Sequence, residues 1–258
     1  MNGCLLRSRR LCWLSAVWVA AQAPLRTAGA GPPFRTDDPE PVETQHWEIN
    51  FFSLGTFNRL EHSGALTGVD ANYGLATDVQ VHSTLFLGYN ANAGETTAIG
   101  MGDLELGVKY RVLSPAEEDW WPQVAVYPLL EVPTGNAQLG LSTGHMQLFV
   151  PIWLQKDFGP WTVYGGGGYF LNPGADNRNY WFSGMVVERK INDQLTLGVE
   201  LFHQTSSQRD IPNTTGYNIG GTYSLFEHLR FLLTIGGGLQ NAATTNRFSY
   251  YAGLQVTF

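Results

Sequence analysis

Four charged residues alternate along the stretch GDLELGVKYRV at 102–112. Asp103 and Glu105 lie near its beginning, and Lys109 and Arg111 lie near its end. Alternate side chains of an extended strand point to opposite faces, so these four share one face and the apolar residues between them share the other. Two acids and two bases on one wall can select solutes in a pore. They can also pair across a narrow lumen and fill it, and both interpretations stay open here.

Other segments are expected to add polar residues to the same inward face. His82, Glu131 and Glu200 complete the set that we predict to line a lumen or its constriction. A lumen that mixes a few charges with aromatic rings suits the slow passage of small, partly apolar molecules better than a wide aqueous pore does. Large apolar side chains also fall on inward positions: Phe86, Tyr127, Leu129, Phe149, Trp153 and Phe202.

Catalytic and metal-binding patterns are weak in this sequence. His203 falls near the end of an alternating segment, with Ser206 and Ser207 after it, which leaves a lipid-modifying enzyme as a minor alternative. A serine nucleophile needs a base that a third group orients, and nothing in the spacing supplies one. The remaining histidines are scattered without metal-ligand spacing. We therefore predict no enzyme, no metal and no cofactor.

The first 30 residues have the pattern of a secretory signal peptide. Three arginines precede the apolar run at 11–23, and TAGA at 27–30 offers a small-residue cleavage site. Its removal takes away both cysteines, so we expect no disulfide and no thiolate site. The segment also holds four of the 15 basic residues and none of the 22 acidic ones, which leaves a net charge of −11. That charge argues against a nucleic-acid partner.

The residues after the signal peptide alternate between apolar and polar side chains over most of the chain, which indicates strands. Tight turns and longer loops follow one another alternately, which is typical of outer-membrane barrels. A soluble β-sandwich also alternates, but it does not explain an apolar face on every segment. We predict an antiparallel transmembrane β-barrel over 46–258, with about twelve strands at 46–57, 66–75, 79–90, 102–113, 122–133, 144–156, 161–170, 179–191, 195–205, 214–226, 229–240 and 247–258.

Aromatic residues near the segment ends predict the girdles that such barrels place at the membrane interfaces. The chain itself ends on Phe258, in the middle of an alternating segment. This terminal residue looks like the signal by which barrel-assembly machinery recognises its clients. The expected girdle comprises Trp47, Tyr89, Tyr110, Trp120, Trp121, Trp161, Tyr180, Trp181, Tyr250 and Phe258.

Residues 31–45, GPPFRTDDPEPVETQ, differ from everything after them because they are rich in proline and acids. Composition alone favours a disordered periplasmic segment. The alternative is a plug that folds into the barrel, where Arg35, Asp37 and Asp38 would pair with charges of the lumen.

Several stretches resemble a family of bacterial outer-membrane proteins grouped as transporters linked to the phenol meta-cleavage degradation pathway. They are PFRTDDPEPVETQHWEIN (33–50), ANYGLATDVQV (71–81), GDLELGVKYRV (102–112), EVPTGN (131–136) and YAGLQVTF (251–258). The resemblance spans nearly the whole chain after the signal peptide, in order. It implies a small barrel in the bacterial outer membrane and the passage of small organic compounds.

Together the residues and the resemblance predict an outer-membrane channel or passive transporter for small hydrophobic or aromatic compounds. Its expected partners are outer-membrane lipid, the barrel-assembly machinery and a small-molecule solute. The main alternative is a structural or adhesion barrel with a filled lumen.

Overall fold

The computed structural model describes residues 32–116 and 119–258. The predicted signal peptide, residues 1–30, lies outside the described residues. No helix in the described part of the chain has the length and apolar character needed to span a membrane.

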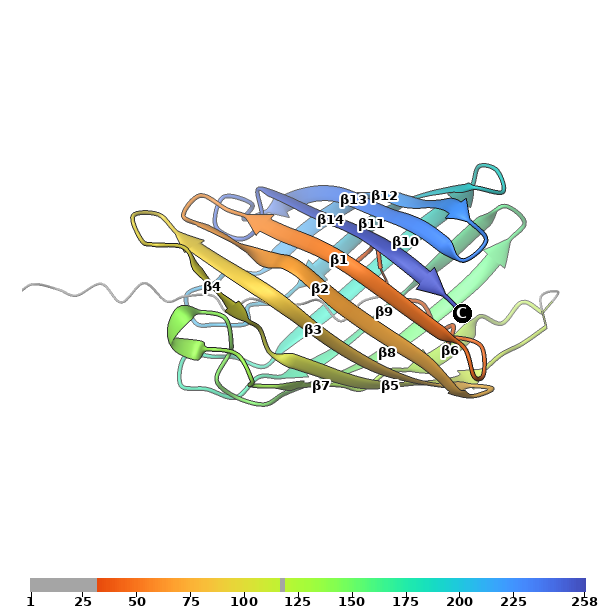
Figure 1. The fold of residues 1–258 in the computed structure, drawn as a ribbon, viewed down its shortest axis with the longest axis horizontal. Coiled ribbons are helices and arrows are strands. Elements are labelled where there is room, and N and C mark those ends of the chain that lie inside the picture. The colour runs from red at the N-terminus through yellow and green to blue at the C-terminus, as the bar shows by residue number, and fades with distance from the viewer. Residues whose placement is uncertain (1–31, 117–118) are drawn as a thin grey trace, which may run out of the picture.

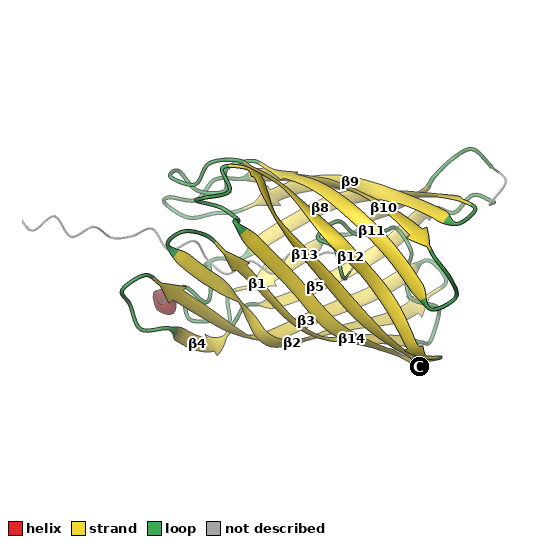
Figure 2. Ribbon diagram, turned by 90° about the horizontal axis from the view of Figure 1, so that it is seen from above, coloured by secondary structure: helices red, strands yellow, loops and turns green. Residues whose placement is uncertain are grey.

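The described residues form one closed antiparallel β-barrel (Figures 1 and 2). Fourteen strand segments make twelve barrel strands. Short β4 continues the line of β5 beside β3, and β6 and β7 together fill the place between β5 and β8. The segments are β1 (Trp47–Phe57), β2 (Glu61–Ala76), β3 (Val79–Asn92), β4 (Ala98–Met101), β5 (Leu104–Leu113), β6 (Gln123–Val126), β7 (Leu129–Val132), β8 (Gln147–Phe158), β9 (Trp161–Leu171), β10 (Tyr180–Lys190), β11 (Leu195–Gln204), β12 (Thr214–Phe226), β13 (Leu229–Gln240) and β14 (Phe248–Thr257).

The barrel closes where the first strand meets the last. Strands β1 and β14 pair from Glu48 opposite Thr257 to Phe57 opposite Phe248. One more reciprocal pair extends this seam, because the amide of Trp47 donates to the carbonyl of Phe258 at 2.7 Å and the reverse bond is 3.0 Å long. Closure gives every strand two neighbours, which removes the unpaired edge that hydrocarbon does not tolerate.

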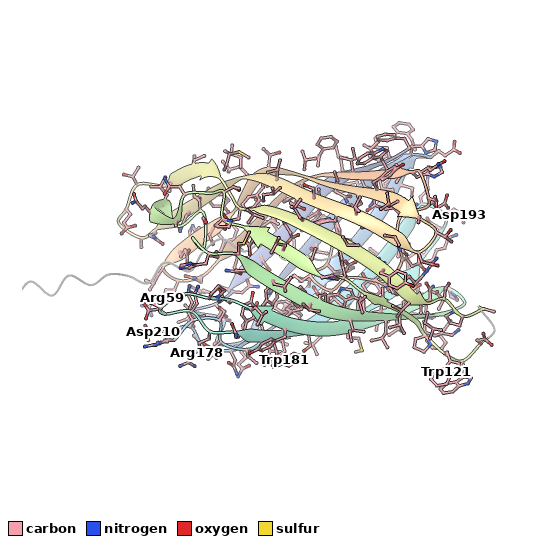
Figure 3. The ribbon with its side chains drawn as sticks, turned by 90° about the horizontal axis from the view of Figure 1, so that it is seen from below. Arg59, Trp121, Arg178, Trp181, Asp193 and Asp210 are labelled. Carbon is pink, nitrogen blue, oxygen red and sulfur yellow. The ribbon has the colours of Figure 1, made fainter. Side chains whose placement is uncertain are left out.

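The predicted alternation of faces is confirmed on β5. Leu106, Val108 and Tyr110 are 40–49% exposed on the outside, whereas Glu105 and Lys109 are 6% and 4% exposed on the inside. The inward apolar residues that the sequence predicted are also buried. The girdle prediction was wrong for Tyr180, which is 2% exposed and faces inward, while its neighbour Trp181 points outward (Figure 3).

Three segment boundaries differ from the predicted ones. The expected loop at 58–65 is a tight turn, since β2 already begins at Glu61. The expected loop at 91–101 contains β4. The expected strand at 122–133 is interrupted at Tyr127 and Pro128, where proline has no amide hydrogen for the ladder.

The two rims differ in the length of their connections. We call the rim with the turns at 77–78, 159–160 and 227–228 the short-turn rim, and the opposite rim the long-loop rim. The long-loop rim carries 133–146, which includes a 3-10 turn at Ala137–Leu139, and the loops 172–179 and 205–213. Both the beginning of β1 and the C-terminus lie at the short-turn rim, as an even strand number requires (Figure 1).

Candidate functional site

The segment 32–45, red in Figure 1, crosses the inside of the barrel. On one wall the hydroxyl of Thr234 in β13 donates to the carbonyl of Pro33 at 2.8 Å. On the other wall the amide of Val42 donates to Gln80 Oε1 in β3 at 2.9 Å. Thr44 then forms a bridge with Gly74 of β2 before β1 begins. Residues 32–45 therefore contact the barrel wall from inside at both of their ends.

Glu200 of β11 holds the beginning of the segment. Its carboxylate accepts the amide of Arg35 at 3.2 Å and both the amide and the hydroxyl of Thr36 at 2.7 Å. Asn218 of the neighbouring strand β12 donates to the same carboxylate. Glu200 is fully buried, and a buried carboxylate is stable only when donors surround it in this way.

The side chain of Arg35 lies on two aromatic rings. Its guanidinium carbon is 4.4 Å from the ring centre of Phe202 and 5.1 Å from that of Phe182. Nη2 also donates to Gln204 Oε1 at 3.1 Å. The face of an aromatic ring is electronegative, so this arrangement stabilises the positive charge.

Lys109 of β5 binds the middle of the segment from the opposite wall. Its ammonium is 3.1 Å from Asp37 Oδ1 and 3.6 Å from Asp38 Oδ1, and it donates to the carbonyl of Glu40 at 3.4 Å. Burial raises the pKa of the Asp37 carboxyl to about 6, although the nearby Lys109 charge acts to lower it. Asp37 and Asp38 of the segment thus both lie next to the ammonium of Lys109.

Two glycines of the wall leave room for the segment. A Cβ atom at Gly184 of β10 would overlap the hydroxyl of Thr36, and one at Gly198 of β11 would come within 2.9 Å of the ring of Phe34. Phe34 is buried against Tyr164 and Val186. Glycine in a strand often marks such a close approach, so the wall fits this part of the chain.

A second polar cluster lies on the wall formed by β2, β3 and β5. His82 Nδ1 is 3.0 Å from Asp70 Oδ1, and His82 Nε2 is 3.0 Å from Glu105 Oε1. Asn72 donates to Asp70 at 3.1 Å and accepts from Gln80 at 2.7 Å. We did not single out Asp70 from the sequence, although the alternation GVDANYG places it on the inward face. Among the described residues, no group of three His, Cys, Asp or Glu side chains is arranged to hold a metal.

The seven residues predicted to line the lumen do not form one constriction. Asp103 instead accepts the amides of Gly135 at 2.9 Å and Thr143 at 3.1 Å, and so anchors the loop 133–146. Arg111 pairs with Asp78 at the short-turn rim, at 3.0 Å. His82 and Glu105 belong to the second polar cluster. Glu131 of β7 lies opposite Glu105 of β5 in the strand register. Lys109 and Glu200 hold the inserted segment.

Aromatic rings line one part of the lumen wall. The ring centres of Phe149 and Phe170 are 3.9 Å apart with an interplanar angle of 9°, and Phe170 stacks on Tyr180 at 4.3 Å and 7°. Phe149 also meets Phe182 edge to face at 6.3 Å. This aromatic wall, residues Phe149, Phe170, Tyr180, Phe182 and Phe202, spans strands β8 to β11 and ends beside Arg35.

Comparison with known proteins identifies the architecture. No family model matches the chain, and no curated protein matches it. Among solved structures, the COG4313 outer membrane channel from Pseudomonas putida F1 is similar over 86% of this chain and 98% of its own, with a TM-score of 0.71 and 15% identity. The chain has the fold of an outer-membrane barrel. Weaker similarity extends to the KdgM porin, with a TM-score of 0.55, 11% identity and coverage of 82% and 99%. The NanC porin also has a TM-score of 0.55 and 11% identity, with coverage of 81% and 98%.

The residues considered for a lipid-modifying enzyme have other partners. His203 Nδ1 is 2.8 Å from the hydroxyl of Thr215. The hydroxyl of Ser206 donates to the carbonyl of Gln208, two residues along the same loop. Neither contact joins a serine to the histidine as a nucleophile requires.

Proposed function

We propose that this protein is a bacterial outer-membrane channel for the passive passage of small hydrophobic or aromatic compounds, plugged at rest by residues 32–45. The observation that carries this proposal is the lumen itself. One part of its wall is a continuous set of stacked rings, and a segment of the chain lies against that wall and is bonded to the opposite one.

The aromatic wall supports a ring-bearing solute. Flat rings offer stacking and edge contacts of about 0.5–1.5 kcal/mol each beyond the area that they bury. Phe149, Phe170 and Tyr180 lie beside one another in the register of β8, β9 and β10, and Phe182 follows two residues further along β10. A flat solute at this wall would therefore contact several rings together. Such weak contacts allow a solute both to bind at this wall and to leave it.

The resemblance to transporters linked to the phenol meta-cleavage pathway agrees with this solute class, and we include that link in the proposal. The similarity to channels and porins supports passage rather than catalysis. A filled structural barrel remains the second candidate. It is favoured by Trp153 and Phe202, which are at most 1% exposed inside the lumen.

The experiment compares the wild type with Gly184→Val in planar bilayers and in liposomes loaded for swelling assays. Valine would collide with Thr36 and displace the inserted segment, because Gly184 faces the segment directly. We expect the variant to conduct at least threefold more current than the wild type and to admit phenol-sized solutes faster.

Ser183→Val is the matched control, since Ser183 lies next to Gly184 on β10 and points outward. Its conductance should equal that of the wild type. If neither the wild type nor Gly184→Val passes any small solute although both are folded, the channel proposal fails and the filled barrel is favoured.

A further inference from the structure

The place that Arg35 occupies has the chemistry of a binding site for a small organic cation. Two ring faces, of Phe182 and Phe202, lie under the guanidinium, and Gln204 accepts a hydrogen bond from its edge. These three residues come from β10 and β11, whereas Arg35 belongs to the inserted segment. The wall residues therefore form a site that the chain fills with its own side chain.

Backbone hydrogen bonds hold the segment at this point in addition to the contacts of the guanidinium. Glu200 accepts the amides of Arg35 and Thr36, and neither of these bonds involves the Arg35 side chain. Phe34, Thr36 and Asp37 are buried, but Arg35 is only half-buried. These two backbone bonds do not depend on the position of the guanidinium.

The charge of the lumen favours a cation over an anion at this site. Asp70, Glu105 and Glu131 lie buried on the inward face of the opposite wall, and Glu200 lies directly behind Arg35. Negative walls around a poorly solvated space raise the local concentration of cations. Aromatic faces add a cation–π attraction, which neutral and anionic solutes do not receive.

We propose that Phe182, Phe202 and Gln204 form a binding site for small organic cations of the guanidinium and alkylammonium class, and that Arg35 is its exchangeable internal occupant. A cation in the lumen competes with the Arg35 side chain for the two rings. The proposal deepens the proposed channel function and rests on it for its biological meaning, although binding can be measured without any passage.

The test is a chemical complementation in refolded protein. Arg35→Ala removes the internal occupant, and ethylguanidinium replaces the missing end of the side chain. N-ethylurea has nearly the same shape without the charge. Isothermal titration calorimetry should show that Arg35→Ala binds ethylguanidinium at least tenfold more tightly than ethylurea. It should also bind ethylguanidinium at least tenfold more tightly than the wild type does.

Two double variants test the location of the site. Arg35→Ala with Phe202→Leu should lose at least tenfold in affinity for ethylguanidinium, because leucine fills the volume but offers no ring face. Arg35→Ala with Phe86→Leu should bind like Arg35→Ala alone, because Phe86 is an inward ring that packs in a separate cluster with Phe52 and Ala65. Arg35→Gln serves in the same comparison if the alanine variants do not refold.

Three results would overturn the proposal: equal affinity for ethylguanidinium and ethylurea, unchanged affinity after Phe202→Leu, or no binding by either the Ala or the Gln variant. Bilayer currents of the same proteins test the channel function separately from the binding site. If ethylguanidinium binds but no current is measured, the channel is refuted and the site is kept. If Arg35→Ala conducts, does not bind ethylguanidinium, and its current is not reduced by ethylguanidinium, only the site is refuted.

Discussion

At the scale of single residues, Asp37 shows how burial and pairing compete. Its carboxyl is 2% exposed and lies 3.1 Å from the ammonium of Lys109. Removing a charge from water costs several kcal/mol, and a single partner repays only part of it. The pKa of Asp37 is raised to about 6, which means that burial raises it more than the Lys109 charge lowers it.

This balance gives a pH prediction. An unfolded aspartate titrates near 3.9, so between about pH 6 and pH 4 folded Asp37 holds a proton that the unfolded chain releases. The free energy of unfolding therefore gains a contribution from this residue as the pH falls through that window. Asp37→Asn removes the contribution. We expect the stability of the variant relative to the wild type to decrease by about 2 kcal/mol from pH 7 to pH 4, as measured by urea unfolding.

Asp193→Asn is the control for this series, because Asp193 is almost fully exposed in a turn. Its stability relative to the wild type should be nearly independent of pH. A constant difference between Asp37→Asn and the wild type across the same range would contradict the assignment of the titration to Asp37.

At the scale of elements, the seam between β1 and β14 decides whether the sheet becomes a barrel. The last reciprocal pair joins the backbones of Trp47 and Phe258, while the Phe258 side chain is 60% exposed. The backbone bonds and the side chain can therefore serve different purposes. We assign closure to the former and propose recognition by barrel-assembly machinery for the latter.

Phe258→Ala separates these two purposes, because it removes the ring and keeps the backbone pairing. We expect refolding into detergent micelles to stay near the wild-type yield, as judged by heat-dependent gel mobility. Assembly in cells should fall several-fold, as measured by the amount of folded protein in outer-membrane fractions. Phe258→Tyr keeps an aromatic end and should assemble normally. Equal losses in micelles and in cells would instead assign the ring to barrel stability.

At the scale of the whole molecule, charge is distributed unevenly. The chain has 22 acidic and 15 basic residues, and several of the acids line the lumen. The strands themselves bury the acids Asp70, Glu105, Glu131 and Glu200 on the inner face, as against the base Lys109, and Arg111 is bound by Asp78 at the rim. The lumen that remains is negative next to an aromatic wall.

We therefore predict that the current through Gly184→Val is cation-selective. In a KCl gradient its reversal potential should lie on the potassium side of zero. Removing two lumen charges with Glu105→Gln and Glu131→Gln should shift it toward zero, since the field inside a low-dielectric pore is screened less than at a surface. Removing two acids outside the lumen with Glu95→Gln and Glu227→Gln should leave it unchanged. A reversal potential on the chloride side would contradict the prediction.

Much of the fold could be predicted from the sequence because alternation fixes the face of each residue. Glu105 and Lys109 were placed inward, and Val108 and Tyr110 outward, from a period of two alone. Errors arose where local rules compete with the ladder, as at Pro128, or where two aromatic residues are adjacent, as at Tyr180 and Trp181. A periodic pattern does not show which of two adjacent rings faces in when both are apolar.

The sequence by itself determined the barrel, its twelve strands and the composition of its inner face. It left open whether residues 31–45 enter the lumen and whether the inward charges meet. Only the tertiary structure decided that Thr36 bonds to Glu200, 164 residues away, and that Arg35 lies on Phe182 and Phe202. The reason is geometric. Alternation specifies the side of a strand on which a residue lies, but its height in the barrel depends on the tilt and stagger of all twelve strands together.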